Sequence, residues 1–154
     1  MFELKAVYSR SEKSATGLAD VAKGKVDVYF DTPAAGAGRS LDDLLTRDDV
    51  STVLVCLPIS VQPDIIRKAI IAGKHVLSEK PVAKDLAEAH KLVDWYNSQA
   101  SPPLWGVAEN FRFIKSLEFA VGQIHAIGGR MTTFRLSQNN FVTQENKYYK
   151  TDCN

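Results

Sequence analysis

Short apolar runs alternate with longer stretches in which apolar residues recur at every third or fourth position along the first hundred residues. The short runs predict five β-strands, at residues 4–8, 26–30, 52–57, 75–78 and 104–107. The longer stretches predict helices at residues 15–23, 41–46, 63–72 and 86–97. Because strands and helices follow one another in turn, the pattern predicts an α/β fold with a parallel sheet covered by helices.

Local signals mark where these elements begin and end. Ser40 and Asp43 form a capping box for a short helix that ends near Thr46, and Gly73 is placed to end the following helix. The run at residues 52–57 is apolar throughout, which is typical of a strand that is buried on both faces of a parallel sheet. Cys56 lies in this run, so a buried thiol is expected there.

The pattern changes after residue 107. Residues 114–124 predict a helix and residues 130–136 a strand, whereas residues 137–154 are polar apart from Tyr148-Tyr149. The change places a boundary near residues 108–113. We therefore expect two parts, a first domain at residues 1–110 and the beginning of a second domain at residues 111–154.

Composition excludes several classes of protein. The 154 residues include 19 Lys and Arg against 18 Asp and Glu, with no basic face for nucleic acid. Apolar stretches are too short to cross a membrane, and the N-terminus has no secretory pattern, so we expect a cytoplasmic protein. The two cysteines cannot form a disulfide scaffold, and the three histidines lack the spacing of zinc ligands, so no metal is expected.

Three segments are candidates for chemistry, because ligands of parallel sheets gather where the strands end. They are Ser9-Arg10, Cys56-Leu57-Pro58 and Glu79-Lys80-Pro81. Lys80 could act as a general acid or base on a substrate hydroxyl or carbonyl. The alternative is that Glu79 and Lys80 form a weak surface ion pair in a turn held by Pro81.

Arg10 bears on the choice of a cofactor. In a dinucleotide-binding fold an acidic residue at this position contacts the ribose 2′-hydroxyl, whereas an arginine accommodates a 2′-phosphate, so Arg10 favours NADP over NAD. The alternative is a solvated loop cation. The glycine fingerprint of such folds is missing, since Gly36-Ala37-Gly38 follows the second strand and Leu41 stands at the third glycine position.

The sequence resembles one oxidoreductase family. The run Gly73-Lys74-His75-Val76-Leu77-Ser78-Glu79-Lys80-Pro81 is similar to the signature of the glucose–fructose oxidoreductase and inositol dehydrogenase family (Gfo/Idh/MocA), most closely its fungal NADP-dependent subgroup. Residues 107–113 resemble the crossover into the second domain of that family. The resemblance implies an N-terminal Rossmann domain, an α/β substrate domain, and hydride transfer between NADP (NAD being the alternative) and a sugar, polyol or related carbonyl compound.

The resemblance also assigns residues. Lys80 matches the lysine that contacts the reacting oxygen, and Glu79 and Pro81 shape its turn, often with a cis bond before the proline. The residues matched to cofactor contacts are Ser9, Arg10, Cys56, Leu57, Pro58, Glu79, Pro81 and Asn110. Gln62 replaces a histidine that is frequent in the family, so no role is assigned to it.

The match begins at the family's second strand. Its first strand, glycine loop and first helix would precede Met1, and its downstream catalytic Asp and His would follow Asn154. We therefore expect an incomplete Rossmann-like sheet, truncated at both ends, in which the family's second and fourth strands lack their shared partner. The chain alone is expected to be inactive, and whether it is an enzyme stays open. The alternative is a non-catalytic protein that associates with full-length members of the family. For the oxidoreductase the expected partners are the dinucleotide and a small substrate. A homo-oligomer is compatible with the sequence.

Overall fold

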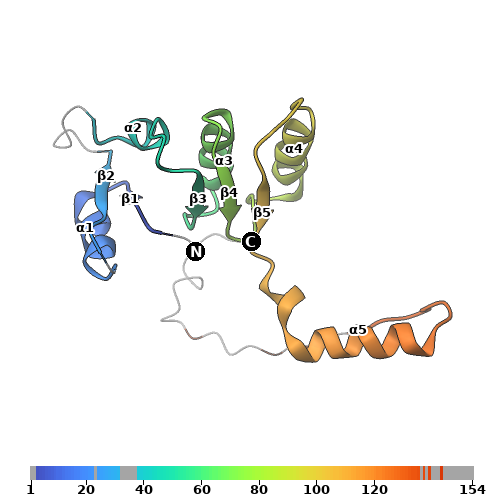
Figure 1. Cartoon of the computed structure of the whole chain (residues 1–154). Helices are drawn as coiled ribbons and strands as arrows, with labels where there is room; N and C mark the ends of the chain where they lie inside the picture. The colour runs from blue at the N-terminus through green and yellow to red at the C-terminus, as the bar shows by residue number, and fades with distance from the viewer. Residues whose placement is uncertain are drawn as a thin grey trace. The chain divides into compact units, whose positions relative to one another are not determined.

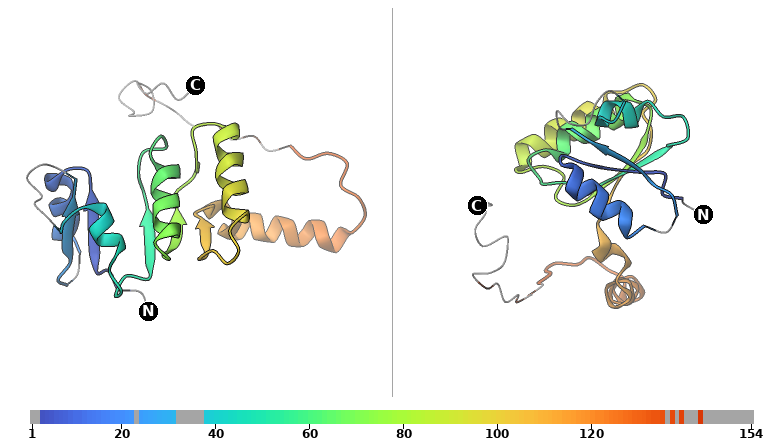
Figure 2. Two further views of the ribbon diagram at one scale, coloured as in Figure 1. Left: turned by 90° about the horizontal axis from the view of Figure 1, so that it is seen from above. Right: turned by 90° about the vertical axis from the view of Figure 1, so that its left-hand side faces the viewer.

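The computed structural model describes residues 3–22, 24–31, 38–135, 137, 139 and 143. The chain forms two compact units, Met1–Ala108 and Glu109–Asn154, which are described one after the other. Strands and helices alternate through the whole of the first unit, as Figures 1 and 2 show. Its elements are β1 (Ala6–Ser9), α1 (Glu12–Asp20), β2 (Asp27–Phe30), α2 (Leu41–Leu45), β3 (Thr52–Val55), α3 (Gln62–Ile71), β4 (His75–Ser78), α4 (Leu86–Asn97) and β5 (Trp105–Val107).

All strand pairs of the first unit are parallel, which confirms the predicted α/β class. β1 pairs with β2, with Ser9 opposite Phe30. β3, β4 and β5 form a separate sheet in that order, with Leu54, Leu77 and Gly106 in one row across it. Within the residues that the structure describes, the free edges of β1 and β3 have no strand partner, as expected from the sequence.

One hydrophobic cluster joins the two sheets. Ile66 of α3 and Leu92 of α4 are fully buried at its centre, and Tyr8 of β1 packs against it from the other sheet. The helix α2 follows β2 and precedes β3 in the sequence, and it contributes three leucines to the cluster: Leu41, Leu44 and Leu45. Since no backbone ladder connects β1 with β3 among the described residues, side-chain packing carries this junction.

Helix caps explain where the helices begin. The Ser40 hydroxyl accepts a hydrogen bond from the Asp43 amide at 3.1 Å, and the Asp43 carboxylate accepts one from the Ser40 amide at 2.8 Å, which is the predicted capping box. Asp85 caps α4 by accepting from the amide of Glu88 at 2.8 Å. α1 begins earlier than predicted, because Ser11 caps it.

The prediction that residues 52–57 form a strand buried on both faces was wrong. β3 ends at Val55, Leu54 is 65% exposed, and Cys56 is exposed rather than buried. α3 packs against β3 and β4 on the side of Val55 and Val76, and within the described residues of the first unit the face that carries Leu54 is left exposed. Apolar composition alone does not reveal whether a second layer is present.

The second unit contains a 3₁₀ helix, η2 (Asn110–Phe113), and one long helix, α5 (Lys115–Ile127), which confirms the predicted helix. The predicted strand at residues 130–136 was wrong over residues 130–135, which form no strand. A strand needs a backbone partner, and the described part of this unit contains none. Leu136, Tyr148-Tyr149 and the first two residues of Gly36-Ala37-Gly38 lie outside the described residues.

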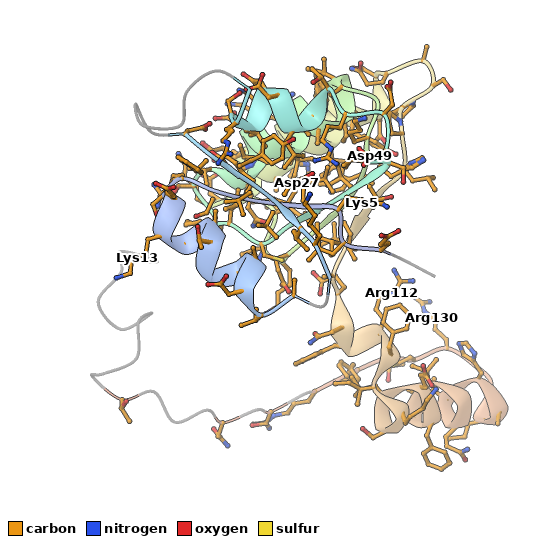
Figure 3. All side chains as sticks on the ribbon, turned by 60° about the vertical axis from the view of Figure 1, so that its left-hand side comes forward. Lys5, Lys13, Asp27, Asp49, Arg112 and Arg130 are labelled. Carbon is orange, nitrogen blue, oxygen red and sulfur yellow. The ribbon has the colours of Figure 1, made fainter. Side chains whose placement is uncertain are left out.

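Arg47 connects the two sheets through polar contacts. Its guanidinium donates two hydrogen bonds to Asp49, both at 2.8 Å, and one to Asp27 of β2 at 2.7 Å. Figure 3 labels these two aspartates. Arg47 also donates to the Tyr29 hydroxyl at 3.1 Å, and its backbone carbonyl accepts from the ammonium of Lys74, which precedes β4. The bidentate bond holds the pKa of Asp49 below its usual range.

Replacing Arg47 with methionine is expected to lower the free energy of unfolding by about 1–2 kcal/mol, because several charge-assisted hydrogen bonds are lost at a side chain that is only 20% exposed. Urea unfolding followed by circular dichroism measures this. Lys68→Met removes an exposed ion pair with Asp42 and serves as the control, with an expected change below about 0.5 kcal/mol. Equal effects of the two variants would contradict the connecting role of Arg47.

Candidate functional site at the ends of β3 and β4

The structure brings two of the three predicted segments together. β3 ends at Val55 and β4 at Ser78, which are register partners in neighbouring parallel strands. The Glu79 amide donates a hydrogen bond to the Val55 carbonyl at 2.9 Å, so the segment Glu79-Lys80-Pro81 starts directly beside Cys56. Ser9 and Arg10 follow β1 in the other sheet. Asn110 belongs to the second unit.

The turn that carries Lys80 is anchored on both sides. Before it, the Ser78 carbonyl accepts from the Ala108 amide at 2.8 Å, and the Ser78 hydroxyl, fully buried, accepts from the Trp105 indole at 3.1 Å. After it, the Pro81 carbonyl accepts from the Gln62 side chain at 2.9 Å. The peptide bond between Lys80 and Pro81 is cis, as the family resemblance implied.

The side chain of Lys80 is exposed between these anchors. Glu79 is exposed as well, so a surface turn before Pro81 remains an alternative; in that turn the Glu79 carboxylate accepts from the backbone amide of Lys80 at 3.2 Å. Lys80 forms no ion pair with any described residue. Its ammonium is therefore accessible to a ligand beside the end of β4.

Cys56 is next to this turn but is not an activated nucleophile. Its side chain is exposed, but neighbouring protein atoms displace part of the water around the thiol and so raise its pKa, and the negative charge of Glu79 raises the pKa further. The thiol therefore stays protonated at neutral pH. What Cys56, Leu57 and Pro58 can offer a ligand is a surface for packing, since Leu57 is half-buried and the other two are exposed.

The segment at the end of β1 has a neighbour that sequence reasoning missed. Because Ser9 pairs with Phe30, Arg10 and Asp31 follow at adjacent strand ends. Asp31 accepts from the Tyr8 hydroxyl at 2.6 Å and from the Leu41 amide at 3.2 Å. Burial and the bond to Asp31 raise the pKa of Tyr8. The rule that ligands gather at strand ends could have identified Asp31, since it follows the predicted second strand directly.

Gln62 is the second residue that was missed. It lies in the first turn of α3, is 2% exposed, and connects this helix to the turn after β4. Nothing in its sequence context marks a buried amide, because helix periodicity does not distinguish a polar residue that faces the core from one that faces solvent.

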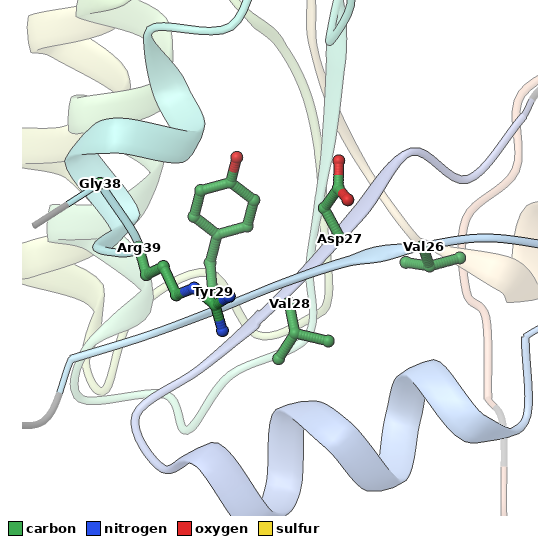
Figure 4. A pocket seen from close by; sticks show the side chains of 6 residues that line it. All are labelled: Val26, Asp27, Val28, Tyr29, Gly38 and Arg39. Atoms are coloured by element: carbon green, nitrogen blue, oxygen red, sulfur yellow. The ribbon is translucent and has the colours of Figure 1, made fainter. Parts of the chain in front are cut away.

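A hollow of about 350 Å³ lies elsewhere, along β2. It is lined by Val26, Asp27, Val28, Tyr29, Gly38 and Arg39 (Figure 4). None of the predicted site residues lines it, so it is not the candidate site.

Within the described ranges, no three His, Cys, Asp or Glu side chains are grouped as a metal site would require. In the same ranges, no helix has the length and apolar character to cross a membrane.

Solved structures of similar architecture are oxidoreductases. The structure of an oxidoreductase from Thermotoga maritima superposes on 99% of this chain with a TM-score of 0.73 and 24% identity, and the match covers 44% of that protein. This similarity shows that the two chains share a fold. KijD10, a 3-ketoreductase from Actinomadura kijaniata solved with TDP-benzene and NADP, matches 80% of this chain with 35% of its own at a TM-score of 0.61 and 27% identity.

Curated relatives and a family model agree with these structures. Dehydrogenase FPY6 of Fusarium mangiferae is 57% identical over 97% of this chain, and an uncharacterised Saccharomyces cerevisiae protein is 34% identical over 97%. The chain spans only 42% and 40% of their respective lengths. Residues 1–102 match the model of the oxidoreductase family with an NAD-binding Rossmann fold, so the chain belongs to the Gfo/Idh/MocA oxidoreductase family.

Proposed function

We propose that this chain supplies part of the active site of an NADP-dependent oxidoreductase, which transfers a hydride between NADP and a sugar, a polyol or a related carbonyl compound. The observation that carries the proposal is the anchored turn of Glu79, Lys80 and Pro81 beside the end of β3. It supports a fixed backbone position for Lys80, whose ammonium is accessible, at the edge of the sheet where ligands of parallel α/β folds bind.

Lys80 is the proposed proton donor and acceptor. In the direction of reduction its ammonium donates a proton to the carbonyl oxygen of the substrate, and in the direction of oxidation its amine accepts the hydroxyl proton. The bound dinucleotide supplies or accepts the hydride. Glu79 and Pro81 hold the turn, and Cys56, Leu57 and Pro58 provide the adjoining surface for the cofactor. The role of Asn110 stays a prediction.

Arg10 is the proposed contact of the NADP 2′-phosphate. It is exposed at the end of β1 and forms no ion pair within the described ranges, and Asp31 beside it is already bonded to Tyr8 and Leu41. A guanidinium suits a phosphate because it donates planar, charge-assisted hydrogen bonds. Ser9 would contact the adjoining ribose.

We expect Arg10→Ser to reduce the preference for NADPH over NADH by about tenfold, the equivalent of one charge-assisted hydrogen bond. The protein for this test is a chimera in which this chain replaces the matching 42% of the Fusarium mangiferae dehydrogenase. Calorimetric titration with both cofactors measures the ratio of dissociation constants. Lys13→Ser, in the first turns of α1, is the control (Figure 3). An unchanged ratio in Arg10→Ser would exclude Arg10 from the 2′-phosphate site.

The chain by itself is proposed to lack turnover. In the described residues β1 and β3 each have an unpaired edge, and no glycine-rich loop follows either strand to bind a pyrophosphate. Substrate specificity would then depend on residues that this chain does not contribute.

The same edges favour a second candidate function, that of a non-catalytic protein which associates with full-length members of the family. Unpaired strand edges can accept a strand from another chain, and the exposed row of Leu54, Leu77 and Gly106 adds an apolar surface beside β3. Gel filtration with and without the Fusarium dehydrogenase tests this. Co-elution supports association, whereas an unchanged, well-folded monomer contradicts it.

A further inference from the structure

Gln62 has an unusual environment for a polar side chain. It is 2% exposed, its Nε2 donates to the Pro81 carbonyl at 2.9 Å, and its Oε1 is buried without a hydrogen-bond partner among the described residues. The orientation of the amide follows from chemistry, because a carbonyl oxygen can only accept and the NH₂ group must therefore face Pro81.

A residue selected for stability alone would not be placed in this way. A buried acceptor without a partner costs free energy, and an apolar side chain of the same volume would avoid that cost. Compared with such an apolar side chain, glutamine adds one hydrogen bond, which its Nε2 donates to the carbonyl of Pro81, the residue after Lys80. The hydrogen bond ties the first turn of α3 to the segment that follows β4.

This bond completes the anchoring of the turn. The Glu79 amide is bonded to Val55 on the side of β3, and the Pro81 carbonyl is bonded to Gln62 on the side of α3. Lys80 is the one residue between these two fixed points. Removing the second point leaves the segment after Lys80 held by the packing of Val82 and Ala83, without a hydrogen bond to α3.

We propose that Gln62 is a positioning residue, which fixes the backbone of the turn from which the side chain of Lys80 extends. This inference rests on the proposed function of Lys80, to which it gives a structural support. The contact with Lys80 is indirect and passes through the backbone of Pro81.

Backbone ¹⁵N relaxation on the 154-residue chain tests the proposal. In Gln62→Met, which keeps the length of the side chain but has no donor, the order parameter of Lys80 is expected to fall from about 0.85 to below about 0.6. The order parameters of β3 and α4 should remain unchanged, and the midpoint of urea unfolding should move little. An order parameter of Lys80 that stays at its wild-type value in Gln62→Met would overturn the proposal.

Two further variants separate positioning from general stability. Gln62→His retains an N–H donor in a different shape and is expected to restore the order of Lys80 even if it lowers the unfolding midpoint. Gln62→Glu keeps the shape, and burial favours its neutral form, whose O–H can donate to the Pro81 carbonyl, so the order of Lys80 is expected to persist while the carboxyl is protonated and to be lost at a pH where it is ionised. If the order parameter of Lys80 falls in proportion to the unfolding midpoint across these variants, whether or not the side chain can donate, then Gln62 contributes only to overall stability. None of these readouts depends on turnover, so a failure of Lys80 as a catalytic residue would be recognised separately.

Discussion

Ile66→Ala is expected to lower the free energy of unfolding by about 2–5 kcal/mol, the range for removing a fully buried aliphatic side chain. Ile66 is 0% exposed and belongs to the cluster that both sheets share. Small domains are stable by only about 5–15 kcal/mol, so this loss is a large part of the total. Urea unfolding followed by circular dichroism and tryptophan fluorescence measures it.

Ile71→Ala provides a matched control for this prediction. It makes the same chemical change at the last residue of the same helix, where the side chain is 74% exposed. Its expected effect is below about 0.5 kcal/mol. If the two variants lose stability equally, the cluster around Ile66 does not hold the sheets together.

Lys80→Ala is expected to reduce the turnover number of the chimera with the Fusarium dehydrogenase by about 10²–10⁴-fold, as is typical when a general acid–base group is removed. NADPH affinity should change little, because the proposed role concerns the substrate oxygen. The absorbance of NADPH, followed with a set of sugars, polyols and aldehydes, gives the rate. Calorimetry on the same proteins gives the affinity.

Lys84→Ala is the control for Lys80. This lysine is also exposed and close in sequence, but it forms a surface ion pair with Glu88 at 2.7 Å, and its loss should leave turnover unchanged. The 154-residue chain without the rest of the dehydrogenase is expected to show no turnover. Lys80-dependent reduction by the chain alone would overturn the proposal that it is inactive by itself, and full activity of Lys80→Ala in the chimera would refute the role of Lys80.

Local sequence signals predicted the elements of the first unit well, because their causes are local. Ser40 and Asp43 need only each other to start a helix, and Gly73 ends α3 with a φ of +77°, a conformation that glycine adopts without strain. The β4 strand is His75–Ser78, as predicted. Parallel pairing followed from the alternation of strands and helices.

The errors concern partners that are distant in the sequence. Leu54 and Cys56 were expected to be buried because their run is apolar, but exposure depends on whether another layer covers that face of the sheet. Residues 130–135 have the alternation of a strand and no strand to pair with in the described part of their unit. Gln62 was assigned no role because it replaces a histidine frequent in the family, and its bond to Pro81 on another element leaves no mark in its own periodicity.

The absence of a backbone ladder between β1 and β3 among the described residues has a consequence for how the molecule opens. Cooperative units in proteins are contiguous regions that can unfold below the global free energy. The pair β1–β2 is joined to the rest by packing and by the contacts of Arg47, so it can open while β3, β4 and β5 remain intact. Amide protons of Val7 and Val28 should therefore exchange with solvent sooner than that of Val76 in the centre of the larger sheet.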